Sequence, residues 1–289
     1  MNRTHRAESP RSPFPSPHLQ LLGQFRLAYG AEAVDLCPNA QRLLALVGLR
    51  SCVSRTVLAG TLWPNATEAH ARGSLRSALC KLPRGERAPV TCCRNTVSIT
   101  DAVTVDARVL ADTALRVVQS AGARGAEPVP AVLFGDGELL PGWEDDWVLL
   151  ERERLRQLRL HALDALAHGL AREGQHALAL EAALTSVRTE PLRESAHRAV
   201  VAAHLAEGNM QEAVRHYVAF WRLLDEELGV PPSALFARQL QSGAAGRRTR
   251  FPVVTSAAVR FRTAAPRSSV RRPRPGRQVG EEEIRTPSA

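Results

Sequence analysis

The sequence predicts a mainly α-helical protein, with a small β-sheet and a β-hairpin in its N-terminal part and an all-α repeat domain after it. Three observations support this prediction. Short strand-like and helix-like patterns alternate over residues 19–103, a 34-residue repeat occurs farther along the chain, and the composition is 44% apolar with only 4% aromatic residues. Cores built mainly from Leu, Val and Ala favour helices. A length of 289 residues is enough for about two domains.

Changes in composition divide the chain into four segments. Residues 1–18 contain four prolines and no periodicity, and the tail of residues 242–289 contains eleven arginines, so we expect both to be disordered. The net charge is +5 over residues 19–103 and −6 over residues 104–241, whereas the tail carries +8 of the chain's total of +9. A polyanion would therefore bind residues 19–103 or the tail, and not the acidic segment.

Missing sequence signals count against several protein classes. The N-terminus lacks the apolar region of a secretory signal, and no apolar run has the length of about 18 residues that a membrane span needs. The five cysteines form no CxxC pair, and the phosphate-loop, GxGxxG and GxSxG motifs are absent. We therefore expect a cytoplasmic protein that binds no metal or cofactor, does not bind the membrane and is not an enzyme.

The cysteines and histidines are expected to be structural residues. Free cysteine is usually buried, so we expect reduced, packed thiols. His161 and His168 lie seven residues apart, as do His197 and His204, which places each pair two turns apart on one helical face. This separation is too large for a shared metal ion, and we expect these histidines to be partly exposed.

A short sheet and two helices are expected at the start of the first domain. Residues 21–27 alternate weakly between apolar and polar side chains, and a second strand-like run follows at residues 34–36. Apolar residues at helical spacing predict a helix over residues 39–48. Ser54 is a suitable N-cap for a second helix, which ends at Trp63.

A third helix is expected from Thr67 to Leu82, and its two faces differ in character. Apolar residues recur at positions 75, 78, 79 and 82, which defines a buried stripe. The opposite face is small, polar and basic, and it carries Gly73, Arg76, Ser77, Cys80, Lys81 and Arg84.

Two strand-like runs at residues 90–93 and 96–99 predict a β-hairpin with its turn at Arg94-Asn95. A small sheet, three helices and a terminal hairpin together describe a winged helix-turn-helix. In such a fold the exposed face of the last helix enters the DNA major groove, and a basic hairpin tip approaches the phosphate backbone or the minor groove.

Seven side chains are candidates for contact with DNA. Base or groove contacts are expected from Arg76, Ser77 and Lys81. Phosphate contacts are expected from Arg55, Arg72 and Arg94. Arg84 is the weakest candidate, because Pro83 disfavours helical geometry at Leu82 and can end the helix about one turn early. An amphipathic helix with polar positions is also ordinary in proteins that bind no DNA, so this alternative stays open.

A 34-residue repeat runs through the second domain. Gly174 recurs as Gly208 within similar local sequences, and Ala179 recurs as Ala213 at the same offset. A glycine turn between two helices with a small residue on the second helix is the tetratricopeptide pattern. Arrays of this kind usually bind partners or dimerise.

Two further helices are expected beside the repeats, at residues 144–169 and 233–241. The first follows an acidic run between Trp143 and Trp147, whose carboxylates lie near the positive end of the helix. Paired carboxylates can also act in acid/base catalysis, but no nucleophile or histidine is close in sequence.

Two stretches of sequence resemble a known family of bacterial regulators. The runs LLPGWEDDWVLLERERLRQLRLHALDALA and EPLRESAHRAVVAAHLAEGNMQEAVRHY resemble the bacterial transcriptional activator domain. Upstream, QRLLALVGLRSCVSRTVLAGTLWPNATEAHARGSLRSALCKL resembles the OmpR-type winged helix of the Streptomyces antibiotic regulatory protein family, a winged helix of the kind found in two-component-like phosphorelay regulators.

This resemblance implies a cytoplasmic transcriptional activator. Such a protein binds direct repeats in promoter DNA, recruits RNA polymerase and commonly regulates antibiotic biosynthesis genes, and family members often bind as homodimers on tandem sites. A competing hypothesis is a helical-repeat adaptor that binds nucleic acid only nonspecifically, through the basic tail with its RRPRPGR run.

Overall fold

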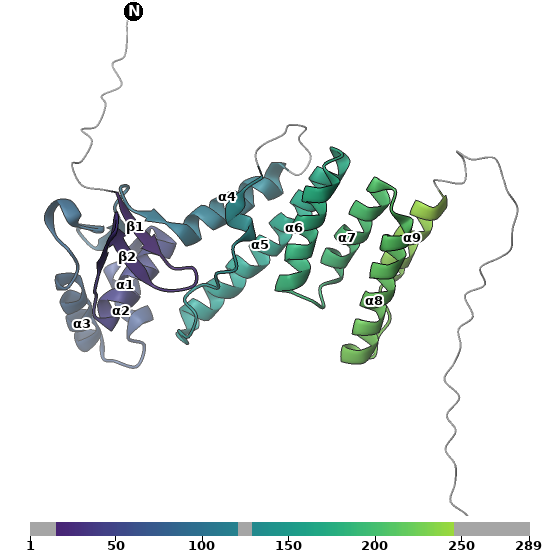
Figure 1. Cartoon of the computed structure of the whole chain (residues 1–289). Helices are drawn as coiled ribbons and strands as arrows, with labels where there is room; N and C mark the ends of the chain where they lie inside the picture. Colours follow the sequence, from purple (N-terminus) through teal and green to yellow (C-terminus); the bar gives the residue numbers. More distant parts are fainter. Residues whose placement is uncertain (1–15, 121–128, 246–289) are drawn as a thin grey trace, which may run out of the picture. The chain divides into compact units, whose positions relative to one another are not determined.

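The computed structural model describes residues 16–120 and 129–245 of the chain (Figure 1). These residues belong to one compact unit, Met1–Thr249, and the second unit, Arg250–Ala289, lies outside the described part. The described elements are a small N-terminal α/β part followed by helices only, which confirms the predicted fold class. The expected disorder of residues 1–18 and 242–289 falls almost entirely outside the described residues.

The N-terminal sheet has four strands in the order β3-β2-β1-β7. Strands β1 (Pro17–Gln20), β2 (Arg26–Tyr29) and β3 (Glu32–Val34) form an antiparallel meander, and the short β7 (Thr104–Val105) pairs in parallel with β1. The prediction of one strand over residues 21–27 was wrong. The chain leaves the sheet after Gln20, because Leu22 forms a bridge to Leu139 instead.

Three helices pack beside a second, three-stranded sheet. They are α1 (Pro38–Arg50), α2 (Arg55–Leu62) and α3 (Glu68–Cys80). The sheet has the order β4-β6-β5, formed by β4 (Cys52–Ser54), β5 (Val90–Cys93) and β6 (Thr96–Ile99), and a 3₁₀ turn η1 (Gly85–Arg87) precedes β5. The β5–β6 hairpin is the predicted wing.

The core of this winged helix is built from leucines on all three helices. Leu43 and Leu44 on α1, Leu58 and Leu62 on α2, and Leu75 on α3 are almost completely buried. The expected cap at Ser54 forms, since its Oγ accepts a hydrogen bond from the backbone N–H of Val57, and Thr67 Oγ1 likewise accepts one from that of His70. The caps fix where α2 and α3 begin.

The second half contains α4 (Asp106–Ser120), the 3₁₀ turn η2 (Ala131–Phe134), α5 (Asp146–Arg172), α6 (His176–Thr189), α7 (Glu194–Glu207), α8 (Met210–Leu228) and α9 (Ala234–Ala245). Consecutive helices from α4 to α8 pack side by side, and α9 packs against α7 and α8 (Figure 1). Gly174 and Gly208 both adopt positive φ at the predicted turns, and Ala179 and Ala213 are fully buried between helices.

Two expectations about single residue types were wrong. All five cysteines are exposed, because they occupy sheet edges, turns and outward helix faces of the small N-terminal part: Cys37, Cys52, Cys80, Cys92 and Cys93. His197 is buried, because α7 lies between two other helices and its ring stacks on His216 and Phe220.

Candidate nucleic-acid interface

The candidate interface is centred on α3, whose limits follow from its sequence. Thr67 caps its first turn, and Glu68 places a carboxylate near the positive end of the helix. The helix ends at Cys80, earlier than the predicted Leu82, because Pro83 excludes helical geometry at the residue before it. Arg84 lies beyond this end and donates from Nη2 to the carbonyl of Cys80 at 3.1 Å.

The two faces of α3 differ as the sequence predicts. Ala71, Leu75 and Ala78 are buried against the core, whereas the side chains of Arg76 and Ser77 are exposed. Gly73 and Ser77 are small, so a partner can approach the helix backbone closely between the longer side chains. A helix with this exposed face has the dimensions and the donor groups that fit a DNA major groove.

Lys81 and Arg72 lie on the same helix as Arg76 but in different surroundings. Lys81 is exposed at the C-cap position, where its charge is favourable near the negative end of the helix. Arg72 is paired with Glu68 one turn earlier, with 2.6 Å between Nη2 and Oε1. Both side chains of this pair are more than half exposed, so solvent weakens the interaction and a phosphate can compete for Arg72.

The wing places two further candidates near each other. Arg94 is exposed at the two-residue turn of the hairpin and adopts φ 46°, in the left-handed region. The backbone N–H of Arg55, at the start of α2, donates to the carbonyl of Asn95 at 2.7 Å. Within the described residues, Nε of Arg55 is buried and has no hydrogen-bond partner.

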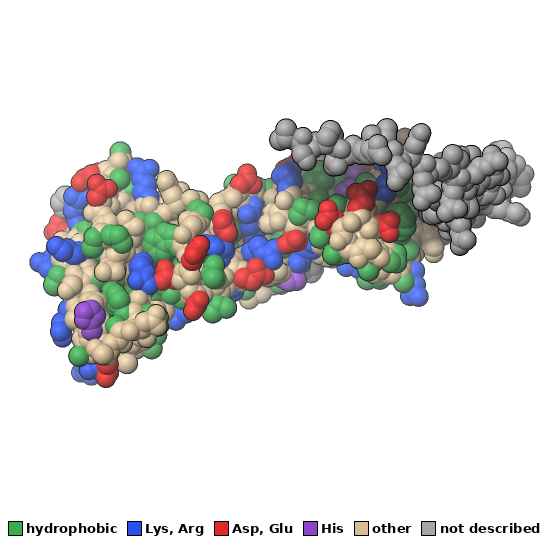
Figure 2. Space-filling model, turned by 90° about the horizontal axis from the view of Figure 1, so that it is seen from below, with side chains coloured by type: hydrophobic (Ala, Val, Ile, Leu, Met, Phe, Trp, Pro, Cys, Tyr) green, Lys and Arg blue, Asp and Glu red, His purple; other side chains and the backbone are tan. Residues whose placement is uncertain are grey.

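The structure thus groups the seven candidates into two sets and one outlier. Arg72, Arg76, Ser77 and Lys81 are carried by α3, Arg55 and Arg94 lie at the wing, and Arg84 caps the end of α3. The space-filling view shows several Lys and Arg side chains, with acidic ones among them, at the end of the molecule that holds the winged helix (Figure 2).

One basic residue of this region has a structural role instead. Arg87 pairs with Glu32 at 2.9 Å, and its guanidinium lies 4.4 Å from the centroid of the Tyr29 ring. The Tyr29 hydroxyl donates to the backbone carbonyl of Arg87. Burial raises the pKa of Tyr29, and the nearby charge of Arg87 opposes this shift. Arg87 therefore fastens η1 to the N-terminal sheet.

Sequence reasoning missed the contacts that join the winged helix to the helices after it. Asp106 accepts hydrogen bonds from the backbone N–H groups of Leu21 at 2.8 Å and Leu22 at 3.0 Å. Arg42 on α1 pairs with Asp145 at the start of α5. The acidic run at residues 144–146 was a visible signal, but nothing in the sequence indicates which basic residue pairs with it.

Residues 16–120 and 129–245 contain neither a candidate metal site nor a candidate membrane-spanning helix. This part of the chain holds no cluster of three or more His, Cys, Asp and Glu side chains that could bind a metal ion. None of its helices is long and apolar enough to cross a membrane.

The helical half of the chain matches a known protein family. Residues 109–242 match the family model described as the bacterial transcriptional activator domain. The helical half of the chain is thus a domain of the kind described as the bacterial transcriptional activator domain. A winged helix before such a domain is the architecture implied by the resemblance to the Streptomyces antibiotic regulatory proteins, so that recognition is confirmed.

Two similar proteins extend this comparison. The chain is 33% identical over 97 residues to the "Regulatory protein AfsR" of Streptomyces coelicolor, a match that covers 34% of this chain and 10% of AfsR. The solved structure of Mycobacterium tuberculosis EmbR in complex with a low affinity phosphopeptide matches 80% of this chain and 65% of that chain, with a TM-score of 0.60 and 17% identity. The likeness to EmbR shows that the fold is shared. The chain spans only about a tenth of the length of AfsR.

Proposed function

We propose that this protein is a sequence-specific DNA-binding transcriptional activator that reads promoter DNA with α3. The exposed face of α3 carries this proposal, since Arg76, Ser77 and Lys81 project from it while Leu75 and its neighbours fix the helix to the core. Arg can contact guanine through two hydrogen bonds in the major groove, and Ser and Lys add further hydrogen-bond donors.

The remaining candidates position the protein on the DNA backbone. Arg94 on the wing and Arg55 at the start of α2 lie on elements other than α3, so we expect them to contact phosphates that flank the groove that α3 enters. Arg72 would exchange Glu68 for a phosphate. These contacts contribute affinity that depends on salt and not on sequence. Arg84, which caps α3, is proposed only as a further phosphate contact.

The helical domain is proposed to contact RNA polymerase and, on tandem direct repeats, a second copy of the chain. Its net charge of −6 over residues 104–241 disfavours direct contact with DNA and leaves its surface to protein partners. The family resemblance supports an activator of antibiotic biosynthesis genes that acts in the cytoplasm without a cofactor and is not an enzyme.

The direct test is footprinting of the full chain on the DNA that flanks its own gene, followed by titration of cognate and scrambled duplexes. Arg76→Ala should weaken cognate binding by about 1–3 kcal/mol and leave scrambled binding nearly unchanged. Arg72→Ala is the matched control on the same helix and should weaken both duplexes alike. Equal losses for Arg76→Ala on both duplexes would contradict base readout by Arg76.

A truncated chain separates this proposal from the adaptor hypothesis. A chain that ends at Thr249 keeps the whole described compact unit and removes most of the basic tail. We expect it to retain sequence-selective binding with a smaller dependence on salt. Complete loss of DNA binding would instead favour an adaptor that binds nucleic acid nonspecifically through its tail.

A further inference from the structure

A cavity of about 350 Å³ lies where the N-terminal part meets the helical domain. Its walls come from the loop after β1, from α4, from the loop before α5, and from α5 itself. Apolar wall residues are Leu22, Leu110, Leu139, Leu149 and Leu155. The volume is at the lower end of the range for small-molecule sites, which is about 300–1,000 Å³. None of these residues belongs to the proposed DNA interface.

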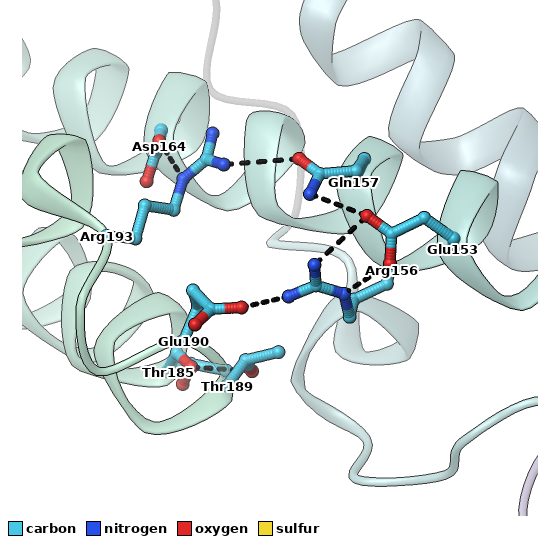
Figure 3. A network of polar contacts seen from close by, with 8 residues as sticks. All are labelled: Glu153, Arg156, Gln157, Asp164, Thr185, Thr189, Glu190 and Arg193. Atoms are coloured by element: carbon cyan, nitrogen blue, oxygen red, sulfur yellow. Dashed lines mark hydrogen bonds and ion pairs between the residues drawn. The ribbon is translucent and has the colours of Figure 1, made fainter.

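Three arginines of α5 line this cavity, and two of them are fully engaged. Arg152 donates to the carbonyls of Leu139 at 2.9 Å, Leu140 at 2.7 Å and Trp143 at 3.1 Å, and it pairs with Glu138. Arg156 pairs with Glu153 through two nitrogens and with Glu190, the residue that follows α6 (Figure 3). These pairings raise the pKa of Arg156 and leave it little capacity for a ligand.

Arg159, one turn farther along α5, differs from both. Its side chain lines the cavity, yet the residue is only 9% exposed. Its Nε donates to the carbonyl of Leu133 at 2.9 Å, which holds the guanidinium in place. Among the described residues, Nη2 is buried and has no hydrogen-bond partner. A buried guanidinium with an unused donor is costly unless an acceptor reaches it.

The other charges at the cavity restrict the chemistry of that acceptor. Asp136, Glu138 and Glu153 line the same cavity, so its three arginines are matched by three carboxylates. A phosphate or another multiply charged anion would be repelled by these carboxylates. A single carboxylate can use the planar donor edge of Arg159 and leave its hydrocarbon part against the leucines.

We propose that this cavity binds a small amphipathic monocarboxylate, with its carboxylate on Arg159 and its apolar part against Leu22, Leu110, Leu149 and Leu155. Such a ligand would touch both parts of the chain. Leu22 belongs to the loop after β1, and the next residue, Gly23, donates its backbone N–H to the carbonyl of Glu138 at 2.7 Å. Occupancy would therefore hold this loop against the helical domain.

The test is calorimetric titration of the full chain with octanoate, beside octan-1-ol and octylammonium as neutral and cationic analogues. We expect octanoate to bind and to slow hydrogen exchange at the Gly23 amide, while the two analogues do neither. Arg159→Met should weaken octanoate at least about tenfold, because it removes the charge-assisted donors and keeps the length of the stem. Arg154→Met is the matched control, since Arg154 lies on α5 outside the cavity and should leave octanoate binding unchanged.

A second variant keeps the proposal testable if Arg159→Met does not fold. Leu149 is a cavity residue that is 45% exposed, so Leu149→Asp should fold and repel a carboxylate at the rim. We expect it to lose octanoate binding as well. The proposal is overturned if octanoate binds no more tightly than octan-1-ol, or if both cavity variants bind octanoate with the affinity of the unaltered chain.

Discussion

Arg42 on α1 forms an ion pair with Asp145, the residue that precedes the first turn of α5. The pair joins the winged helix to α5, the long helix that precedes α6 in the helical domain. Both side chains are about a quarter exposed, at 25% and 23%, so solvent screens the pair only in part. The two partners lie 103 residues apart in the sequence.

We expect a modest coupling free energy between Arg42 and Asp145. Arg42→Met and Asp145→Asn each remove one charge, and Asn keeps a side chain that suits the helix start. A double-mutant cycle on the free energy of urea-induced unfolding should give a coupling of about 0.5–1 kcal/mol that decreases with added salt. A coupling of zero at low salt would show that the pair contributes nothing in solution.

Cys80 should report directly on the orientation of α3. Its thiol is exposed on the same outward face as Arg76 and Ser77, as the helical periodicity predicts, although free cysteine is usually buried. If this face enters the major groove, alkylation of Cys80 by N-ethylmaleimide should block cognate binding, and bound DNA should slow the alkylation. We expect a chain in which only Cys80 is replaced, by Ser, to resist inactivation, whereas Cys37→Ser should remain sensitive.

Arg94 should show opposite effects on stability and on DNA binding. Its φ of 46° is unfavourable for a side chain with a Cβ and is readily adopted by glycine. Arg94→Gly should therefore raise the free energy of unfolding by about 0.5–1 kcal/mol. The same change should weaken binding to cognate and scrambled DNA equally, because it removes a phosphate contact. A loss of stability would show that the Arg94 side chain stabilises the hairpin.

The buried His197 on α7 and the partly buried His216 on α8 should make the protein sensitive to acid. His197 Nδ1 lies 3.0 Å from Nε2 of His216, and Nε2 of His197 lies 2.8 Å from the carbonyl of Pro191. Burial lowers the pKa of His197, while Glu194 opposes this shift. Burial, together with the charges of His197 and His204, lowers the pKa of His216 to about 4.

Because these pKa values are lower in the folded chain than in the unfolded chain, unfolding takes up protons below the ordinary histidine pKa of about 6.5. Stability should be constant above that pH and fall by about 1–2 kcal/mol between pH 6.5 and pH 4, after allowance for the partial exposure of His216. His216→Gln should reduce this slope in urea unfolding, and His168→Gln on exposed surface should not. Equal slopes for all three proteins would exclude the histidine pair as the cause.

Local signals in the sequence predicted local structure well. Ser54 acts as the expected cap, the third helix begins after Thr67 as expected, and Gly174 and Gly208 make the expected turns, since capping and positive φ depend on neighbouring residues alone. The candidate DNA residues on α3 were found for the same reason, because helical periodicity separates its faces. Whether these residues contact DNA remains a prediction.

Long-range packing could not be predicted in the same way. The burial of His197 depends on two helices that flank α7, and the cavity at Arg159 depends on a loop from the N-terminal sheet. The exposure of the cysteines reflects how little of the small N-terminal part is interior. No periodicity along the chain encodes which distant segments meet.

The pairing of β7 with β1, and the two hydrogen bonds from Leu21 and Leu22 to Asp106, have a consequence for module exchange. Strand β7, directly before α4, completes the sheet of the winged helix, and Asp106, the first residue of α4, accepts the two hydrogen bonds from the segment after β1. A chimaera that exchanges the winged helix between relatives must therefore keep the donor's own residues up to and including Asp106. A junction placed upstream of β7 would leave the backbone N–H groups of Leu21 and Leu22 without their acceptor. It would also leave the winged helix without β7.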